Sequence, residues 1–149
     1  MNLKEEVSNK CREILDEKIA SLKKILLDLQ QSAANETKST AGDKHETALA
    51  MLQIEQENTS RQLQALLGQR LQLTQIDLSK KANIIGKGSL IYTNRGLIFI
   101  AIGLGKVQMD NTICLVISPT SPLGILLLTK KVSDIVQCNG IDYQIDQIG

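Results

Sequence analysis

Residues 3–33, LKEEVSNKCREILDEKIASLKKILLDLQQSA, decide how this chain folds. Apolar side chains recur there at spacings of three or four, and this set is Leu3, Val7, Cys11, Leu15, Ile19, Leu22, Leu26, Leu29 and Ala33. Such spacing places them on one side of an α-helix of about thirty residues, roughly 45 Å long. Because one narrow apolar stripe needs one partner, the pattern predicts a coiled coil.

The partner is expected in the next stretch of the chain. Its apolar positions are Ala48, Leu52, Leu63, Leu66, Leu67, Leu71, Leu73 and Ile76, and the polar Gln56 and Thr59 interrupt them, which predicts a weak seam there. Residues 35–42, NETKSTAG, are small and polar and contain a glycine, which is typical of a turn followed by a helix start. The simplest arrangement is an antiparallel hairpin within one chain. The structural alternative is that a second copy completes the polar seam.

The composition changes near residue 80, from charged and Gln-rich to β-branched and punctuated by glycine. Strands are predicted at 89–93, 97–102, 112–118, 135–138 and 143–148, with turns at 94–96 and 139–140 and a further turn at Gly103-x-Gly105. One short helix is predicted over 121–129. Ser121 would cap it, Pro122 would take its first position, and Leu123, Leu126 and Leu127 would face the sheet. The fold class is therefore α+β: a helical hairpin over 1–80, with its tip near 35–46, and a small antiparallel sheet domain over 81–149.

Composition and charge argue against several classes of protein. The chain has 149 residues with 17 Lys and Arg against 16 Asp and Glu, a net charge of +1, and shows no basic run suited to independent DNA binding. Three cysteines without a CxxC pair indicate neither a disulfide framework nor a zinc site. The most apolar stretch, 113–128, contains Pro119 and Pro122 and is too short to span a bilayer. With no apolar signal core at the start, we expect a cytoplasmic protein without membrane contact.

Asp43 and Glu46 place two carboxylates three residues apart at the expected hairpin tip. This spacing, at the start of an amphipathic run, is typical of a helix capping box, which stabilises a helix by roughly 1 kcal/mol and needs no metal. The same pair also suits Mg²⁺, which takes one or two carboxylates together with water and phosphate. The residues alone leave both interpretations open. His45 has no second ligand at helical spacing, and we assign it no catalytic role.

Two segments resemble a known family. Residues 121–136, SPLGILLLTKKVSDIV, resemble the Ser-Pro-Ile/Leu-Gly-x-Ala-Leu-Leu-Gly-Lys-x-x-Gly-Asp-x-Val segment of the Gre-type transcript cleavage factors of bacterial RNA polymerase. Residues 42–48, GDKHETA, resemble that family's Gly-Asp-Leu-Ser-Glu-Asn-Ala at the hairpin tip. A long N-terminal coiled coil before the sheet domain is also the family's order. The resemblance implies a sheet domain like that of the FK506-binding proteins (FKBP-like).

The resemblance also implies a function. The hairpin would enter the polymerase's secondary channel, where Asp43 and Glu46 would help the polymerase hold a catalytic Mg²⁺, so that the polymerase cleaves backtracked RNA. The chain would then be no enzyme by itself, and it would meet the RNA 3′ end only indirectly. The segment formed by Ser121, Pro122, Leu123, Gly124 and Ile125 would dock on the polymerase.

Departures from the family pattern define the alternatives. Lys44 and His45 replace the family's Leu-Ser, which favours a channel-binding regulator or inhibitor without cleavage activity as the second hypothesis. A coiled-coil homo-oligomer is the third, although a monomer is the expected state. Prolyl isomerase activity is disfavoured, because only Tyr92, Phe99 and Tyr143 are available to line an aromatic proline pocket.

Overall fold

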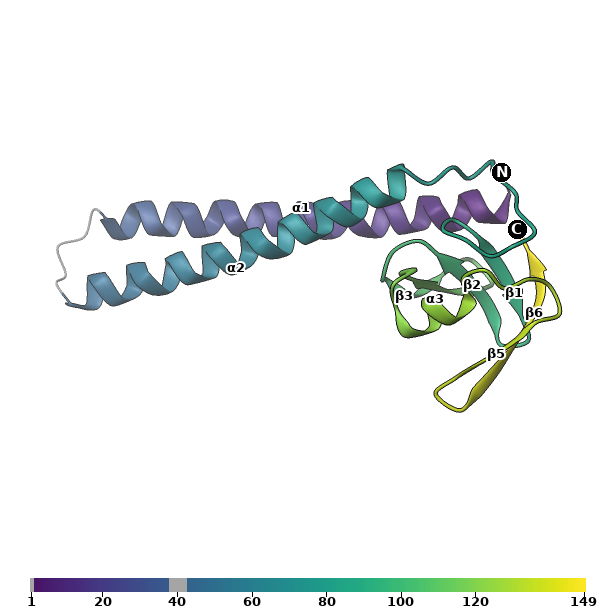
Figure 1. Cartoon of the computed structure of the whole chain (residues 1–149). Coiled ribbons are helices and arrows are strands. Elements are labelled where there is room, and N and C mark those ends of the chain that lie inside the picture. Colours follow the sequence, from purple (N-terminus) through teal and green to yellow (C-terminus); the bar gives the residue numbers. More distant parts are fainter. Residues whose placement is uncertain (1, 38–42) are drawn as a thin grey trace. The chain divides into compact units, whose positions relative to one another are not determined.

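Two long helices open the fold, and a six-stranded sheet follows them (Figure 1). The computed structural model describes residues 2–37 and 43–149, and the side chains of 2–36 and 46–149. Helix α1 is Leu3–Thr37 and helix α2 is Asp43–Thr74, and they lie side by side and run in opposite directions. The expected helical hairpin followed by a sheet domain is therefore confirmed as an α+β architecture.

The sheet contains strands β1 (Leu90–Thr93), β2 (Gly96–Ile100), β3 (Gly105–Gln108), β4 (Ile113–Ile117), β5 (Ile135–Cys138) and β6 (Ile141–Ile148), in the order β3-β4-β2-β1-β6-β5. Asn139 and Gly140 have φ angles of 52° and 77°, the positive values that a tight hairpin turn between β5 and β6 requires. The five predicted strands are confirmed at these places, with boundaries shifted by one or two residues.

Two expectations about the sheet are wrong. The sheet is mixed rather than antiparallel, because β2 and β4 pair in parallel, with Leu97 opposite Cys114. Only a turn was expected at Gly103-x-Gly105, whereas strand β3 begins at Gly105 and pairs with β4. Strand β3 has one buried side chain, Val107, between exposed Lys106 and Gln108, so its four residues give almost no apolar signal in the sequence.

The sheet is covered on both faces. One face contributes Ile91, Ile98 and Ile100 to a core cluster that also contains Leu123 and Leu127 of helix α3 (Pro122–Leu127). The other face carries side chains that alternate with these along the strands, and they are equally buried: Leu90, Phe99, Val107, Cys114 and Val116. Two layers of side chains therefore pack against this one sheet.

The first turns of α1 cover the second face of the sheet. Val7 and Cys11 have no exposed surface, and the pKa of Cys114 is raised to about 12 by burial and by the neighbouring Cys11. Burial also raises the pKa of Cys11, to about 11. Lys4 ties the start of α1 to the sheet end, since its Nζ donates to the carbonyl oxygens of Lys80 at 3.0 Å and Gly149 at 3.4 Å. The start of α1 thus belongs to the core of the sheet domain.

The chain divides into two compact units. The sheet unit contains Met1–Glu13 and Leu71–Gly149, and the hairpin unit contains Ile14–Arg70. The composition predicts a boundary near residue 80, between 1–80 and 81–149, because it registers residue types, whereas the two compact units reflect contacts in space. The α1 stripe reflects the division: its spacing is four throughout from Val7 to Ile19 and alternates between three and four from Ile19 to Ala33. Each spacing of four turns the stripe by about 40°, so the stripe changes direction along the helix.

The seam of the hairpin unit differs from the expected one on α2. Half-buried or buried positions follow an alternation of four and three: Leu52, Gln56, Thr59, Leu63, Leu66 and Arg70. Leu67 and Leu71, which were expected in the seam, are 36% and 59% exposed. They were assigned to the seam because they are apolar, whereas the heptad spacing of the seam continues through polar residues such as Gln56 and Arg70. Arg70 Nε donates to Asp16 Oδ1 at 2.9 Å, an exposed ion pair worth about 0–1 kcal/mol.

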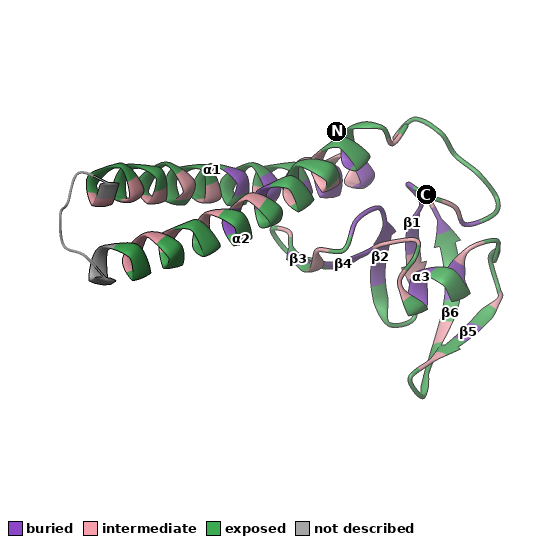
Figure 2. Cartoon of the chain, turned by 60° about the vertical axis from the view of Figure 1, so that its left-hand side comes forward, coloured by how far each residue is buried: buried purple, intermediate pink, exposed green. Residues whose placement is uncertain are grey.

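Side-chain burial in the hairpin unit decreases along α1 from Leu15 toward the C-terminus of that helix. Leu15 is fully buried and Ile19 and Leu63 nearly so, whereas Leu26 and Leu52 are only half-buried. Figure 2 shows that the buried colour on α1 is confined to the part toward its N-terminus. Coiled coils draw most of their stability from apolar seam positions, and two of the α2 positions are Gln56 and Thr59. The part of the hairpin beyond them is therefore held together weakly.

Replacing Gln56 with leucine should strengthen this seam. Gln56 is half-buried, and burying part of an apolar side chain there should stabilise the hairpin unit by about 1 kcal/mol. Thermal unfolding followed by far-UV circular dichroism measures the effect. The control is Gln53→Leu, because Gln53 is exposed on the same helix and should gain little. Equal stabilisation by both variants would mean that the seam does not run through Gln56.

Among the described residues, neither α1, α2 nor α3 has a stretch apolar enough, at sufficient length, to cross a membrane.

Candidate functional site

The hairpin tip carries the two predicted acidic residues at the start of α2. Asp43 is the first residue of α2, and Glu46 lies within the same first turn. Side chains three residues apart on a helix lie on neighbouring positions of one side, and the positive end of the helix dipole stabilises carboxylates there. The Glu46 side chain is exposed. Residues 38–42 and the side chains of Asp43, Lys44 and His45 lie outside the described residues.

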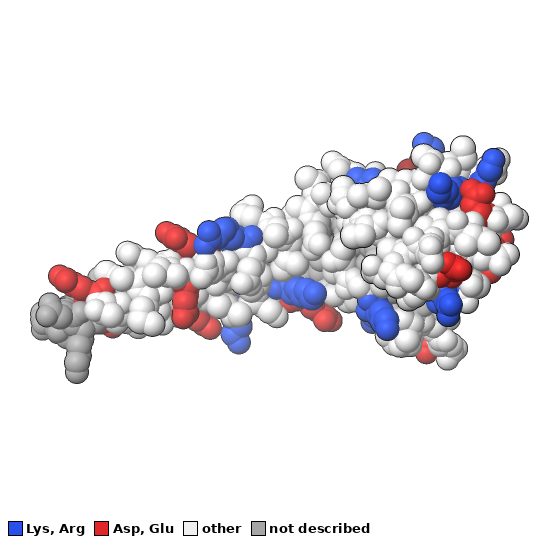
Figure 3. Space-filling view, turned by 60° about the horizontal axis from the view of Figure 1, so that its bottom comes forward, with Lys and Arg blue, Asp and Glu red and all other residues white. Residues whose placement is uncertain are grey.

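The helix start is compatible with both interpretations of the tip. A capping box and a pair of metal-ligating carboxylates both need these residue types in the first turn of a helix. In the part of the chain that the structure describes, no three His, Cys, Asp or Glu side chains gather in one group. Figure 3 shows acidic and basic side chains interspersed along the visible face of the hairpin, without a continuous basic surface.

The segment expected to contact a partner begins with a helix cap. Ser121 is the N-cap of α3, with φ −69° and ψ 159°, and its Oγ accepts a hydrogen bond of 3.1 Å from the backbone N–H of Gly124. The same hydroxyl donates to the carbonyl oxygen of Ser118 at 2.6 Å. Pro122 occupies the first turn, where its missing N–H costs nothing. The predicted cap and proline position are confirmed.

Helix α3 divides the rest of the segment into buried and exposed residues. Leu123, Gly124 and Leu127 are buried, whereas Pro122, Ile125 and Leu126 are exposed, the last two at 60% and 42%. The expectation that Leu126 faces the sheet is wrong, because a helix of six residues presents only one narrow face to it. Of the residues proposed as partner-binding, only Pro122 and Ile125 offer exposed apolar surface.

Gly124 stands where no larger residue fits. A Cβ atom added there would overlap the carbonyl oxygen of Ser118 and lie 2.8 Å from Ser121 Oγ and 3.1 Å from Pro119 Cα. The two backbone neighbours belong to the turn that leads into α3, so they cannot move without breaking the cap. The Ser-Pro-Leu-Gly sequence therefore has a structural explanation in every polar or small position: a cap, a helix start and a close backbone approach.

Two residues after α3 adopt a backbone conformation that disfavours them. Thr129 has φ 70° and Ser133 has φ 78°, in the left-handed region that is unfavourable for residues with a Cβ atom and most unfavourable for β-branched ones. Both lie in well-connected backbone, since Thr129 N–H donates to Ile85 O at 2.9 Å and Ser133 N–H to Ile145 O at 2.8 Å. These hydrogen bonds, to the segment before the sheet and to β6, thus hold them in this conformation.

Substituting glycine at these two positions should stabilise the sheet unit. Relief of the left-handed conformation is worth roughly 1–2 kcal/mol per residue, and the added freedom of glycine in the unfolded chain offsets about half of that. Thr129→Gly with Ser133→Gly should therefore raise the free energy of unfolding by about 1 kcal/mol, measured by urea titration. The control is Thr120→Gly, a residue without a positive φ, which should not stabilise. A loss of stability in the double variant would contradict the assigned conformation.

The Asp134 carboxylate organises the turn between α3 and β5. Asp134 Oδ2 accepts from the Lys131 N–H at 2.9 Å, and the Asp134 N–H donates to the Lys131 carbonyl oxygen at 3.0 Å. The backbone of Lys130 and Lys131 also pairs with Ile84 and Ile85, which join this turn to the segment before the sheet. Asp134 is therefore a turn residue, and its carboxylate needs no ligand to account for it.

The three aromatic residues all lie in the sheet unit. Phe99 has no exposed surface and is part of the sheet core. Tyr143 is half-buried and packs against the core cluster near α3, and Tyr92 lies on β1.

Sequence reasoning missed some of these features. The positive φ angles of Thr129 and Ser133 were not predicted, although the family segment places glycine at both positions, which was the available signal. No feature of the sequence indicated that Leu126 is exposed, because the longer helix expected over 121–129 would place Leu126 on the side that faces the sheet.

Comparison of the chain with family models, with curated proteins and with solved structures found no match.

Proposed function

We propose that this chain is a transcription elongation factor of the Gre type, which binds bacterial RNA polymerase and inserts its helical hairpin into the secondary channel. The observation that carries the proposal is the backbone of Thr129 and Ser133. These are the two positions at which the family segment has glycine before Lys130 and Asp134, and both have φ angles near +70 to +80° here.

This agreement between the backbone conformation and the family motif is stronger support than the match of residue types alone. A short motif can match by chance, whereas a positive φ is the physical reason why glycine is preferred at a position. Here the chain keeps the conformation without keeping the glycine. Ser121 and Gly124 add a helix cap and a close backbone approach at the motif's first and fourth positions. On these grounds we propose that the sheet domain is FKBP-like in the way the family's is.

The tip residues fit the proposed role. Asp43 and Glu46 share the first turn of α2, and carboxylate oxygens are the ligands that Mg²⁺ prefers. They would hold the ion jointly with the polymerase, where Mg²⁺ activates a water for RNA hydrolysis. The chain's own part is to deliver two carboxylates at the start of a helix, and it is no enzyme by itself. It would meet the RNA 3′ end only through the polymerase and would work in the cytoplasm.

The exposed side of α3 is the candidate second contact with the polymerase. Pro122 and Ile125 belong to the segment expected to dock, and Leu126 extends the same exposed apolar surface. Leu123 and Gly124 would act by positioning α3, because both residues are buried.

A second candidate is a channel-binding regulator that does not stimulate cleavage. It is favoured by the sequence of the tip, where Lys44 and His45 stand between the two acidic residues in place of the family's Leu-Ser. A cationic side chain beside two carboxylates weakens their attraction for a divalent ion. Binding would then persist while the catalytic contribution is lost.

The test is RNA release from backtracked elongation complexes of a bacterial RNA polymerase in Mg²⁺ buffer, together with direct binding to the polymerase. Faster cleavage with binding supports the first candidate, and binding without faster cleavage supports the second. Failure to bind the polymerase at all would overturn both. A deletion of residues 20–60 is the matched control, because it removes most of the hairpin unit and leaves the sheet unit's residues in place.

A further inference from the structure

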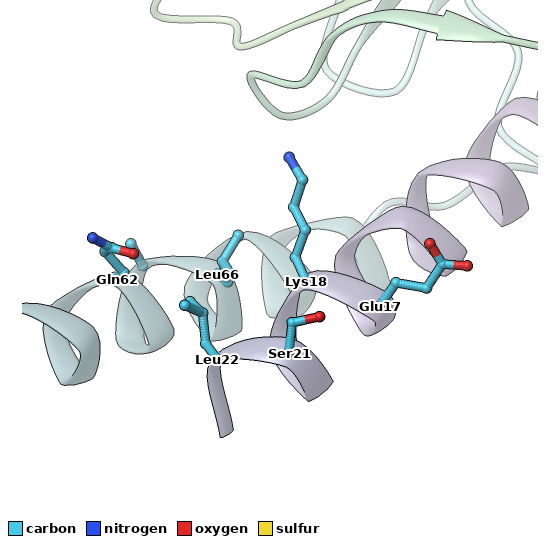
Figure 4. A pocket seen from close by; sticks show the side chains of 7 residues that line it. Glu17, Lys18, Ser21, Leu22, Gln62 and Leu66 are labelled. Atoms are coloured by element: carbon cyan, nitrogen blue, oxygen red, sulfur yellow. The ribbon is translucent and has the colours of Figure 1, made fainter. Parts of the chain in front are cut away.

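One pocket of the sheet unit differs from the grooves of the hairpin unit in the charge of its lining. A groove of about 570 Å³ in the hairpin unit is lined by one acid, Glu17, and one base, Lys18, so its charges cancel (Figure 4). The pocket in the sheet unit has a volume of about 350 Å³, and its lining contains Lys4, Lys80 and Lys81 and, among the described residues, no acid. We call it the lysine pocket. Its lining favours an anion.

Lys4 is a buried cation in this lining. Its residue is only 8% exposed, although lysine is almost never fully buried unless it is paired. Its Nζ donates to the carbonyl oxygens of Lys80 and Gly149, at 3.0 Å and 3.4 Å. An ammonium group has three N–H donors, so one remains, and within the described part of the chain no ion pair joins Lys4 to a carboxylate. A buried charge of this kind is costly until an anion pairs with it.

The charged groups around Lys4 do not cancel its charge. Burial lowers the pKa of the Lys4 ammonium, Asp77 opposes that shift, and Lys81 adds to it. The Asp77 carboxylate is exposed and accepts hydrogen bonds from the Ser79 N–H at 3.0 Å and from Ser79 Oγ at 2.6 Å. The three lysines of the lining and this one aspartate give a net charge of +2.

The start of α1 adds backbone donors to the same pocket. Asn2 caps the helix, because its Oδ1 accepts from the Glu5 N–H at 2.9 Å and its carbonyl oxygen accepts from the Glu6 N–H at 3.0 Å. The N–H groups of Leu3 and Lys4 have no acceptor among the described residues, and both residues line the pocket. Free N–H groups and the helix dipole make a helix start attractive to anions, and here they act beside a buried ammonium.

We propose that the lysine pocket binds a small phosphate monoester, with its phosphate beside Lys4 and Lys81 and its organic part against Leu78, Leu90 and Tyr92. A phosphate monoester carries a charge of about −1.5 to −2 at neutral pH, which matches the net positive charge of the site. Lysine is a compact point charge that suits phosphate, whereas planar carboxylates favour the fork of arginine. Leu90 and Tyr92 are two residues apart on β1 and so share one face of the strand.

The test is titration of the whole chain with phenyl phosphate at constant ionic strength, followed through backbone amide shifts by two-dimensional NMR. Saturable shifts are expected at Leu3, Lys4 and Tyr92, with a dissociation constant of about 1 mM or lower. Because the site uses none of the residues assigned to polymerase contacts, this test needs no polymerase, and its result does not depend on the proposed function.

Two lysine variants test the phosphate contact. Lys81→Gln should raise the dissociation constant about tenfold, because it removes a charge-assisted hydrogen bond. Lys81 is exposed, so the fold should be retained, which circular dichroism verifies. Lys4→Gln should weaken binding at least as much. Since Lys4→Gln also removes the contacts to Lys80 and Gly149, Lys81→Gln is the deciding variant.

Lys87→Gln is the matched control. It removes the same charge from an exposed lysine in the segment before the sheet that is not part of the pocket lining, and it should leave the dissociation constant unchanged. Inorganic phosphate should bind about fivefold more weakly than phenyl phosphate, because it has no apolar part to bury. Equal affinity for the two would overturn the assignment to an ester. No saturable shift up to about 20 mM, well above the expected dissociation constant, would overturn the site. So would equal weakening by Lys87→Gln and Lys81→Gln, because binding would then follow overall charge.

Discussion

Gly124→Ala is expected to destabilise the sheet unit by about 3 kcal/mol, at the upper end of the cost of overpacking. The added methyl group would overlap the carbonyl oxygen of Ser118 and crowd Ser121 Oγ and Pro119 Cα. In most helices alanine is more favourable than glycine by up to about 1 kcal/mol, so the expected sign is opposite to that of helix propensity. Urea unfolding followed by circular dichroism measures the change.

The cost at Gly124 arises because relief in any direction breaks something else. Moving Ser118 disrupts its carbonyl's hydrogen bonds with the Ser121 hydroxyl and N–H, at 2.6 Å and 3.1 Å. Moving α3 withdraws Leu123 and Leu127 from the core cluster. Gly86→Ala is the control in the same unit, since nothing lies within 4 Å of a Cβ atom there and its φ is not positive. If Gly124→Ala were no worse than Gly86→Ala, the close approach would not exist.

Replacing the acidic tip residues is expected to abolish stimulated RNA cleavage if the first proposed function holds. Asp43→Asn and Glu46→Gln keep the shape of each side chain and remove its charge, so each loses a carboxylate that would help hold Mg²⁺. We expect each to lower the stimulated cleavage rate by roughly 100-fold, the scale on which a single electrostatic contribution to a transition state acts. Polymerase binding should change little, since the rest of the hairpin is unaltered.

The stability of Asp43→Ala and Glu46→Ala separates the metal role from the capping role, because Asn and Gln can still cap a helix whereas Ala cannot. Loss of a helix cap costs about 1 kcal/mol, whereas loss of a metal ligand that acts only in the complex costs the free protein nothing. Glu55→Gln is the charge control, because Glu55 is exposed on α2 away from the first turn. If Asp43→Asn and Glu46→Gln cleave normally while Asp43→Ala and Glu46→Ala unfold more easily, the pair returns to the role of a helix cap.

Most of the helical region was predictable from spacing alone. The stripe from Leu3 to Ala33 and the polar segment over 35–42 locate α1, the start of α2 and the reversal between them. The spacing did not reveal that the first turns of α1 also cover one face of the sheet. Cys11 looks like any stripe residue in the sequence, and only the fold places it beside Cys114. Periodicity reports that a face is buried and not what buries it.

The candidate sites divide in the same way. Ser121 and Pro122 could be assigned as cap and first helical residue because local backbone chemistry dictates both. The need for Gly124 depends on the carbonyl oxygen of Ser118, and the strain at Thr129 and Ser133 depends on backbone hydrogen bonds to Ile85 and Ile145. Such features involve partners distant in the chain or backbone angles that the residue type itself disfavours, so propensity cannot reveal them.

The sequence by itself determined the order of the elements, the position of the acidic pair at the start of α2, and five of the six strands, because each depends on interactions between residues near one another in the chain. Only the tertiary structure decided the parallel pairing of β2 with β4 and the exposure of Leu67, Leu71 and Leu126. These depend on which surfaces meet in space. Burial is a property of the packed chain, and an apolar side chain alone does not specify its partner.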